Sequence, residues 1–212
     1  CGYALLHQFI FKAKAKKEDS LKINHDADDA DVLYSCSETV CTTMREISDI
    51  YNHMLVALFT ENRKALKETV QQSEVLYHDA NKRKYGIMMT IKKLQDQKIE
   101  TAHFYVQVVD YITEVTKALL HCTRPAYEHI DNNHKGFTEE QIVDLKLIND
   151  EVENIFNAVN EMLTNKDFSR LDDVLVMRDA LFEIIAERIK NQIRRIKAGE
   201  ASTRASALYF NI

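Results

Sequence analysis

The stretch Glu100–His121, ETAHFYVQVVDYITEVTKALLH, is the part of the sequence that decides the fold class. Along it and one residue beyond, apolar side chains recur at spacings of four and three residues, at Phe104, Val108, Tyr111, Val115, Ala118 and Cys122. Such spacing places all of these side chains on one face of an α-helix. We therefore expect a long helix that packs against its neighbours through this seam.

A row of polar residues runs beside the seam at the same spacing, formed by His103, Gln107, Asp110, Glu114, Lys117 and His121. Residues four apart share one face of a helix, so these side chains form either a solvated surface or a line of ligands. As ligands, His103, Asp110 and Glu114 predict a site for iron, manganese or zinc. As a solvated surface, the row would hold ordinary pairs such as Glu114 with Lys117.

The composition of the whole chain also indicates helices. Its 212 residues include four Gly and one Pro, which are too few for the turns of a β-sheet. The sequence also contains no run of alternating β-branched residues of the kind that predicts a strand. We predict an all-α protein with long antiparallel helices.

The net charge and the cysteines of the chain exclude some functions. The net charge of −5, without basic residues interleaved with aromatics, argues against nucleic-acid binding. The four cysteines form no CxxC pair, and no run of about 18 apolar residues predicts a membrane span.

The first 20 residues differ in character from the rest. Apolar residues at Tyr3, Leu5, Leu6, Phe9, Ile10 and Phe11 precede lysines at 12, 14, 16 and 17. An apolar stretch followed by clustered lysines suits an anionic membrane surface or a connector to a membrane span. We assign residues 1–27 to such an amphipathic, juxtamembrane-like segment. The alternative is a first helix docked on the bundle, with its lysines solvated.

Interruptions of the apolar pattern divide the remaining chain into helices. We predict three helices before residue 132, at about Asp31–Phe59, at 66–94 and at 100–131. A fourth helix begins at the capping box of Thr138 and Gln141, and a fifth runs from near Asp167 to about Ala198. A sixth element follows Gly199. Within the third of these, Pro125 predicts a kink or a restart, because proline lacks a backbone N–H.

The two halves of the chain align with each other at a shift of 105 positions. Apolar residues coincide along this alignment, and so do three polar pairs, Glu46 with Glu151, Asn52 with Asn157 and Lys92 with Lys197. We predict tandem three-helix-bundle repeats, with residues 28–136 as the first and residues 137–212 as the second. The last helix of the second repeat is shorter than its counterpart, so we expect the native polypeptide to continue beyond Ile212.

Three stretches of the chain resemble a known family. HFYVQVVDYITEVTKALLH, RPAYEHIDNNHKGFTEEQI and GEASTRASALYFNI are similar to the cytosolic PhoU-like portion of bacterial Na⁺/phosphate cotransporters. The resemblance covers residues 36–212 and implies a non-enzymatic domain that regulates phosphate uptake at the cytoplasmic face of the inner membrane. It implies the membrane domain of a transporter as partner, with the N-terminal segment at the membrane surface. A second copy of the chain, as a homo-oligomer, is a further expected partner.

The PhoU family places acidic residues four apart on the third helix of each repeat, where they gather iron or another metal. In this chain Asp110 matches the second acid, whereas Val106 occupies the first acidic position. Glu114 supplies a replacement pair with Asp110 one turn later. The resemblance therefore implies an altered form of the family's metal cluster in the first repeat.

Two other functions are consistent with parts of the sequence. A free-standing PhoU-type adaptor would bind an ABC transporter or a sensor kinase. A ferritin-like di-metal protein is disfavoured, because the ExxH of Glu100–His103 has no second copy in the chain. The sequence shows no nucleophile–base constellation, no glycine-rich phosphate loop and no zinc-ligand spacing, so we expect the chain not to be an enzyme.

Overall fold

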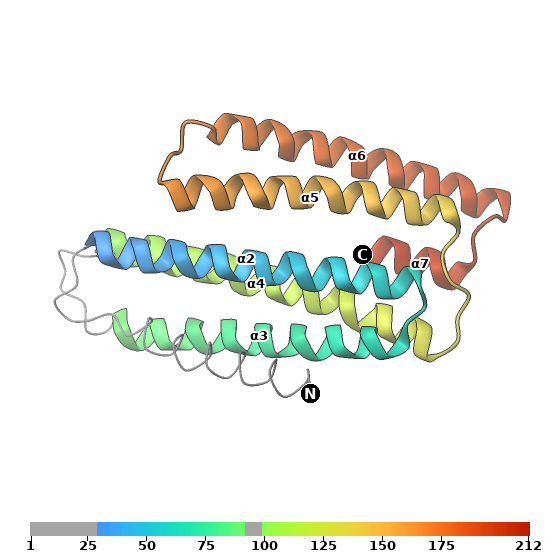
Figure 1. Cartoon of the computed structure of the whole chain (residues 1–212), viewed down its shortest axis with the longest axis horizontal. Coiled ribbons are helices and arrows are strands. Elements are labelled where there is room, and N and C mark those ends of the chain that lie inside the picture. Colours follow the sequence, from blue (N-terminus) through green and yellow to red (C-terminus); the bar gives the residue numbers. More distant parts are fainter. Residues whose placement is uncertain (1–28, 92–98) are drawn as a thin grey trace, which may run out of the picture.

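The computed structural model describes residues 29–91 and 99–212, and the regular elements in these ranges are α-helices (Figure 1). They are α2 (Asp29–Phe59), α3 (Arg63–Ile91), α4 (Ile99–Asp131), α5 (Glu139–Asn165), α6 (Leu171–Ala198) and α7 (Thr203–Asn211). The predicted all-α helical bundle is confirmed. The segment assigned to residues 1–27 lies outside the described residues. Among the described helices, none combines the length and the apolar character needed to cross a membrane.

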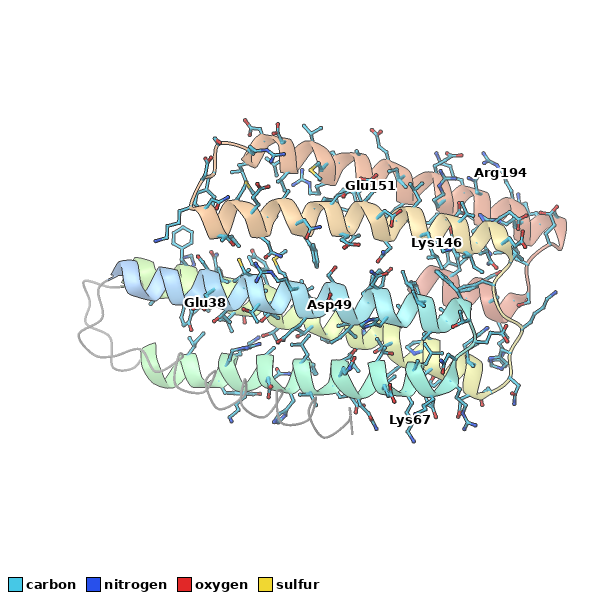
Figure 2. All side chains as sticks on the ribbon, viewed as in Figure 1. Glu38, Asp49, Lys67, Lys146, Glu151 and Arg194 are labelled. Atoms are coloured by element: carbon cyan, nitrogen blue, oxygen red, sulfur yellow. The ribbon has the colours of Figure 1, made fainter. Side chains whose placement is uncertain are left out.

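The helices lie side by side in two groups. Helices α2, α3 and α4 pack against one another as a three-helix bundle, and α5 lies along α2 (Figure 1). Figure 2 shows Lys146 of α5 pointing toward α2, where its Nζ lies 5.9 Å from the centroid of the Phe59 ring. Helix α6 packs on α5, and the short α7 contacts both α6 and α4. The tandem repeat and its boundaries at 28–136 and 137–212 remain predictions.

Local chemistry sets the ends of α5 and α6. The predicted capping box is present, because Thr138 Oγ1 accepts from the Gln141 N–H and Gln141 Oε1 accepts from the Thr138 N–H. Gly199 ends α6 with a φ of 73°, a left-handed conformation that favours glycine. Helix α6 begins at Leu171, later than the predicted start near Asp167, because the Asp167 carboxylate accepts from the Ser169 N–H and forms a turn.

Pro125 does not restart the third helix, so that part of the prediction is wrong. Helix α4 runs continuously from Ile99 to Asp131 with Pro125 inside it. The carbonyl that loses its helical partner belongs to His121, an exposed residue, and water can satisfy it. The next residue, Ala126, is fully buried, so core packing holds the helix together across the proline.

The inward face of α4 is not the predicted seam. Phe104, Tyr111 and Val115 are exposed by 62, 69 and 39 %. The buried residues of α4 instead include Tyr105, Val109, Thr113, Thr116, Leu119, Leu120, Thr123 and Ala126. The predicted seam included no threonine, but the threonine hydroxyls bond to carbonyls of their own helix, as Thr113 does to Val109 O at 2.7 Å. A threonine satisfied in this way can lie in the interior.

The largest apolar cluster lies where α2, α3, α4 and α7 meet. It contains Met54, Leu55, Ala57, Leu58, Leu66, Ala126 and Leu208, which are all 4 % exposed or less. Leu208 belongs to α7, so this short helix completes the end of the first bundle. Burial of the Leu208 side chain in this cluster fixes α7 to the bundle.

Truncation of one cluster residue tests this account of the core. Met54 is fully buried, whereas Val56, two positions along α2, is 57 % exposed. We expect Met54→Ala to lower the free energy of unfolding by about 2–5 kcal/mol, because it leaves a cavity. Val56→Ala should change it by less than about 0.5 kcal/mol. Urea denaturation followed by circular dichroism measures both, and equal effects would contradict the assigned orientation of α2.

Candidate functional site

The structure places the polar row of α4 on the outer side of that helix. His103, Gln107, Glu114 and His121 are exposed, and Asp110 is half-buried. His103 makes an edge contact with the ring of Phe104, with 6.4 Å between centroids. Across the residues that the structure describes, no three His, Cys, Asp or Glu side chains gather closely enough to hold a metal ion. The metal site at His103, Asp110 and Glu114 thus stays a prediction.

Both carboxylates of the row have cationic neighbours. Lys84 of α3 places its Nζ 2.8 Å from Asp110 Oδ1, and Lys117 lies 3.7 Å from Glu114. The hydrogen bond to Asp110 raises the pKa of Lys84, so this ammonium group is charged at neutral pH. The pair of Glu114 and Lys117 is the one expected for a solvated face. A metal bound at Asp110 would therefore compete with the Lys84 ammonium for the same oxygen.

This competition gives the metal prediction a direct test. In Lys84→Met the ammonium is removed, so a metal held by His103, Asp110 and Glu114 should bind more tightly than to the wild type. Asp110→Ala should abolish that binding. Titration calorimetry with Fe²⁺, Mn²⁺ and Zn²⁺ on chelator-treated protein measures the affinities. Equal binding by all three proteins would show that the polar row is not the ligand set.

A second polar group, which the sequence did not predict, lies buried between α5, α6 and α7. At its centre is Asp144, whose side chain is 7 % exposed. Its carboxylate forms an ion pair and a hydrogen bond with Arg195 and lies 3.2 Å from Arg188 Nη1. It also accepts a hydrogen bond from Tyr209 Oη at 3.1 Å. One carboxylate thus holds side chains from two other helices.

A chain of neutral hydrogen bonds lies beside this group. Gln141 Nε2 donates to Gln192 Oε1 at 3.1 Å, and Gln192 Nε2 donates to Ser206 Oγ at 2.9 Å. Ser206 Oγ donates in turn to the Ser202 carbonyl at 2.8 Å. Both glutamines are fully buried. Together with Asp144, these residues form what we call the α5–α6–α7 joint, a polar interior that is almost fully hydrogen-bonded.

The charges of the joint favour one protonation state. Burial, and then the neighbouring Asp144 carboxylate, raise the pKa of Tyr209, so its hydroxyl keeps the proton that it donates to Asp144. The Arg195 guanidinium also lies over the Tyr209 ring, 5.7 Å from its centroid. These contacts hold α7 in place on α6. They explain how a helix of only nine residues keeps a fixed position.

A weak sequence signal for the joint exists in hindsight. Gln141 and Asp144 share the helical phase of the apolar residues Leu145 and Ile148, so they interrupt a buried face. On α6, Arg188, Gln192 and Arg195 follow one another at spacings of four and three. Polar residues at core positions of two adjacent helices predict a buried network only once the two helices are known to pack. That pairing was not evident from one sequence.

Removal of the central carboxylate tests the joint. Asp144→Ala leaves Arg195, whose side chain is 11 % exposed, without its anionic partner. Breaking a buried pair in this way destabilises proteins by about 3–5 kcal/mol. We expect a loss of that size in urea denaturation, together with faster amide hydrogen exchange in α7. Asp150→Ala, at an exposed position of α5, is the matched control and should leave both measurements unchanged.

A third feature is apolar. Phe104, Tyr111 and Val115, which we call the α4 apolar row, lie on one face of α4 and are each at least 39 % exposed. They lie beside the polar row at helical spacing. Scattered exposed apolar residues are normal, but a row that includes two aromatic side chains is typical of a contact surface.

Comparison of the chain with protein-family models, with curated proteins and with solved structures finds no match. The resemblance to the PhoU-like portion of cotransporters is therefore carried by the sequence segments alone. The structural features that bear on function are the polar row and the apolar row of α4 and the α5–α6–α7 joint.

Proposed function

We propose that this chain is a non-enzymatic regulatory domain for phosphate uptake and forms the cytosolic portion of a Na⁺/phosphate cotransporter. Two observations support the proposal. Three sequence segments resemble that portion of the cotransporters. The α4 apolar row gives the bundle a surface suited to another protein, and this surface is the observation that carries the proposal.

The composition of this surface matches that of protein interfaces. Such interfaces are enriched in aromatic side chains at their centre and are polar at their rim. On α4, Phe104 and Tyr111 supply two aromatic side chains that are exposed by 62 and 69 %. The ion pairs of Asp110 with Lys84 and of Glu114 with Lys117 lie beside them and supply charged groups. The surface therefore offers apolar anchors together with hydrogen-bonding groups.

The fold gives this surface a rigid support. Helix α4 has 33 residues, or a length of about 50 Å, and its inner face is held by α2 and α3. A partner that binds the outer face contacts side chains whose backbone is fixed by the bundle core. Docking of this helix on the cytosolic face of the transporter is the mechanism by which we propose that the domain controls transport. The N-terminal segment 1–27 would set the distance of the bundle from the membrane.

A double substitution on α4 tests the proposal. Phe104→Glu/Tyr111→Glu replaces both aromatic anchors with charges and should weaken docking by at least roughly tenfold. In cells that carry this variant, we expect loss of the regulation of phosphate uptake, measured as the initial rate of radiolabelled phosphate entry before and after phosphate starvation.

The matched control is Tyr85→Glu, because Tyr85 is 75 % exposed and lies on α3. It should leave the uptake response as in the wild type. Circular dichroism of the purified proteins shows whether all variants are folded. If the α4 double variant regulates phosphate uptake like the wild type, the α4 surface does not dock on the transporter and the proposal is wrong.

A further inference from the structure

Helix α6 carries an exposed apolar row of its own. Leu175, Phe182, Ile189 and Ile196 follow one another at intervals of seven residues and are exposed by 39, 61, 41 and 42 %. Leu171 and Ile193, exposed by 50 and 44 %, extend the same face. We call these six residues the α6 apolar row. It runs along the whole of the 28-residue helix, a length of about 42 Å.

The position of α6 explains why this row is exposed. Helix α6 lies at the outer edge of the molecule, and α5 covers one side of it (Figure 1). At its C-terminal end α6 also meets α7, where Gln192 bonds to Ser206. Within the described part of the chain, the solvent exposure of the row shows that no other element covers it.

The spacing of the row is that of a helix–helix seam. Apolar residues at seven-residue intervals keep facing a partner helix as the two wind gently around each other. An amphipathic surface helix of a globular protein needs a single apolar face toward its own core. Helix α6 has that face toward α5, where Val174 and Gln192 are buried, and the heptad row in addition.

The charges beside the row indicate which helix fits there. Asp172, Asp179 and Glu183 flank its first half, in which Arg178 is the one basic residue. Lys190, Arg194 and Lys197 flank its second half, in which Glu187 is the one acidic residue. Figure 2 shows Arg194 on the outer side of α6. An antiparallel copy of the same helix brings each acidic half against a basic half. We propose that α6 is a homodimerisation surface, on which α6 of a second copy of this chain packs antiparallel about a twofold axis.

The apolar residues fit this arrangement in one register. When Phe182 faces Ile189 of the second copy, Leu175 faces Ile196, because both pairs are centred between residues 185 and 186. In that register Asp172 faces position 199 of the second copy. Lys197 of the second copy is two residues from that position, so Asp172 and Lys197 are offset by about 3 Å along the helix axis. Asp179 has the same offset from Lys190 of the second copy. Both pairs are within reach of long side chains.

These charged groups are available for such pairs. Asp172, Glu183 and Lys197 make no ion pair within the described residues, and Asp179 pairs with the neighbouring Arg178 at 2.8 Å, at exposed positions. Lys190 and Arg194 pair only with Glu187 of their own helix, at 3.8 and 3.3 Å and at exposed positions. Exposed pairs of this kind contribute little to stability and can exchange partners. A parallel arrangement would instead place like charges together.

The inference does not depend on the proposed function, because the α6 apolar row and the α4 apolar row lie on different helices. Loss of dimerisation and loss of uptake regulation are therefore separate results. If the chain dimerises but the α4 double variant regulates phosphate uptake like the wild type, the α6 surface is a dimer interface and the proposed function is wrong.

Sedimentation equilibrium of the purified 212-residue chain over a range of concentrations tests the dimer. We expect a dimer for the wild type. Phe182→Glu/Ile189→Glu places four charges at the centre of the seam and should raise the dissociation constant at least roughly 100-fold. Ala180→Glu is the control, because Ala180 is exposed on the same helix but lies on the side opposite the row.

A cysteine experiment tests the antiparallel orientation. Ala186 lies next to the twofold axis, so the Ala186→Cys variant should form a disulfide between the two copies of position 186 under mild oxidation. Leu175→Cys should not, because antiparallel packing places the two copies of position 175 far apart. Mass spectrometry identifies the bond. A wild type that stays monomeric, a Phe182→Glu/Ile189→Glu variant that dimerises like the wild type, or a disulfide at position 175 would overturn the proposal.

Discussion

The hydrogen bonds that buried threonines make to their own helix allow them to lie, together with Tyr105, Val109 and Leu119, on the side of α4 that faces the core. Thr113 and Thr116 donate to carbonyls of α4 at 2.7 and 2.8 Å, so both side chains can lie in the interior. The buried face, which also carries Tyr105, Val109 and Leu119, differs by one residue from the face of Phe104 and Tyr111. One residue turns a helix by about 100°, and this rotation places Phe104 and Tyr111 on the outside. The surface on which the proposed function rests follows from that rotation.

The second group of helices depends on polar rather than apolar contacts. Asp144 binds Arg195 and Tyr209, and the two buried glutamines, Gln141 and Gln192, link α5 to α6 and α7. This joint positions α7 so that Leu208 completes the apolar cluster of the first bundle. Helix α6 is held on one side only, and its exposed row remains available. The described part of the molecule therefore presents an apolar row on both groups of helices, on α4 and on α6.

The sequence predicted most of the helices, since Gly, Pro and capping residues interrupt the apolar pattern clearly. The capping box at Thr138 was predicted correctly, because it depends on two residues close in sequence. The phase of α4 was not, because Tyr105, Val109 and Leu119 form a second apolar face one residue away from the predicted seam. Periodicity cannot choose between two such faces or tell a satisfied threonine from a solvated one. The joint at Asp144 escaped prediction because it depends on which helices pack together. For the polar row, the sequence did not reveal that Lys84 of a different helix pairs with Asp110.

Photocrosslinking from position 111 in living cells tests most directly whether the outer face of α4 is a docking surface. A photoreactive phenylalanine analogue replaces Tyr111, and a second protein carries it at Tyr85 on α3 as a control. Mass spectrometry identifies whatever is joined to each position after illumination. We expect adducts with the membrane domain of a phosphate transporter from position 111 and none from position 85. Illumination that joins position 111 to no protein, or to the same proteins as position 85, would contradict it.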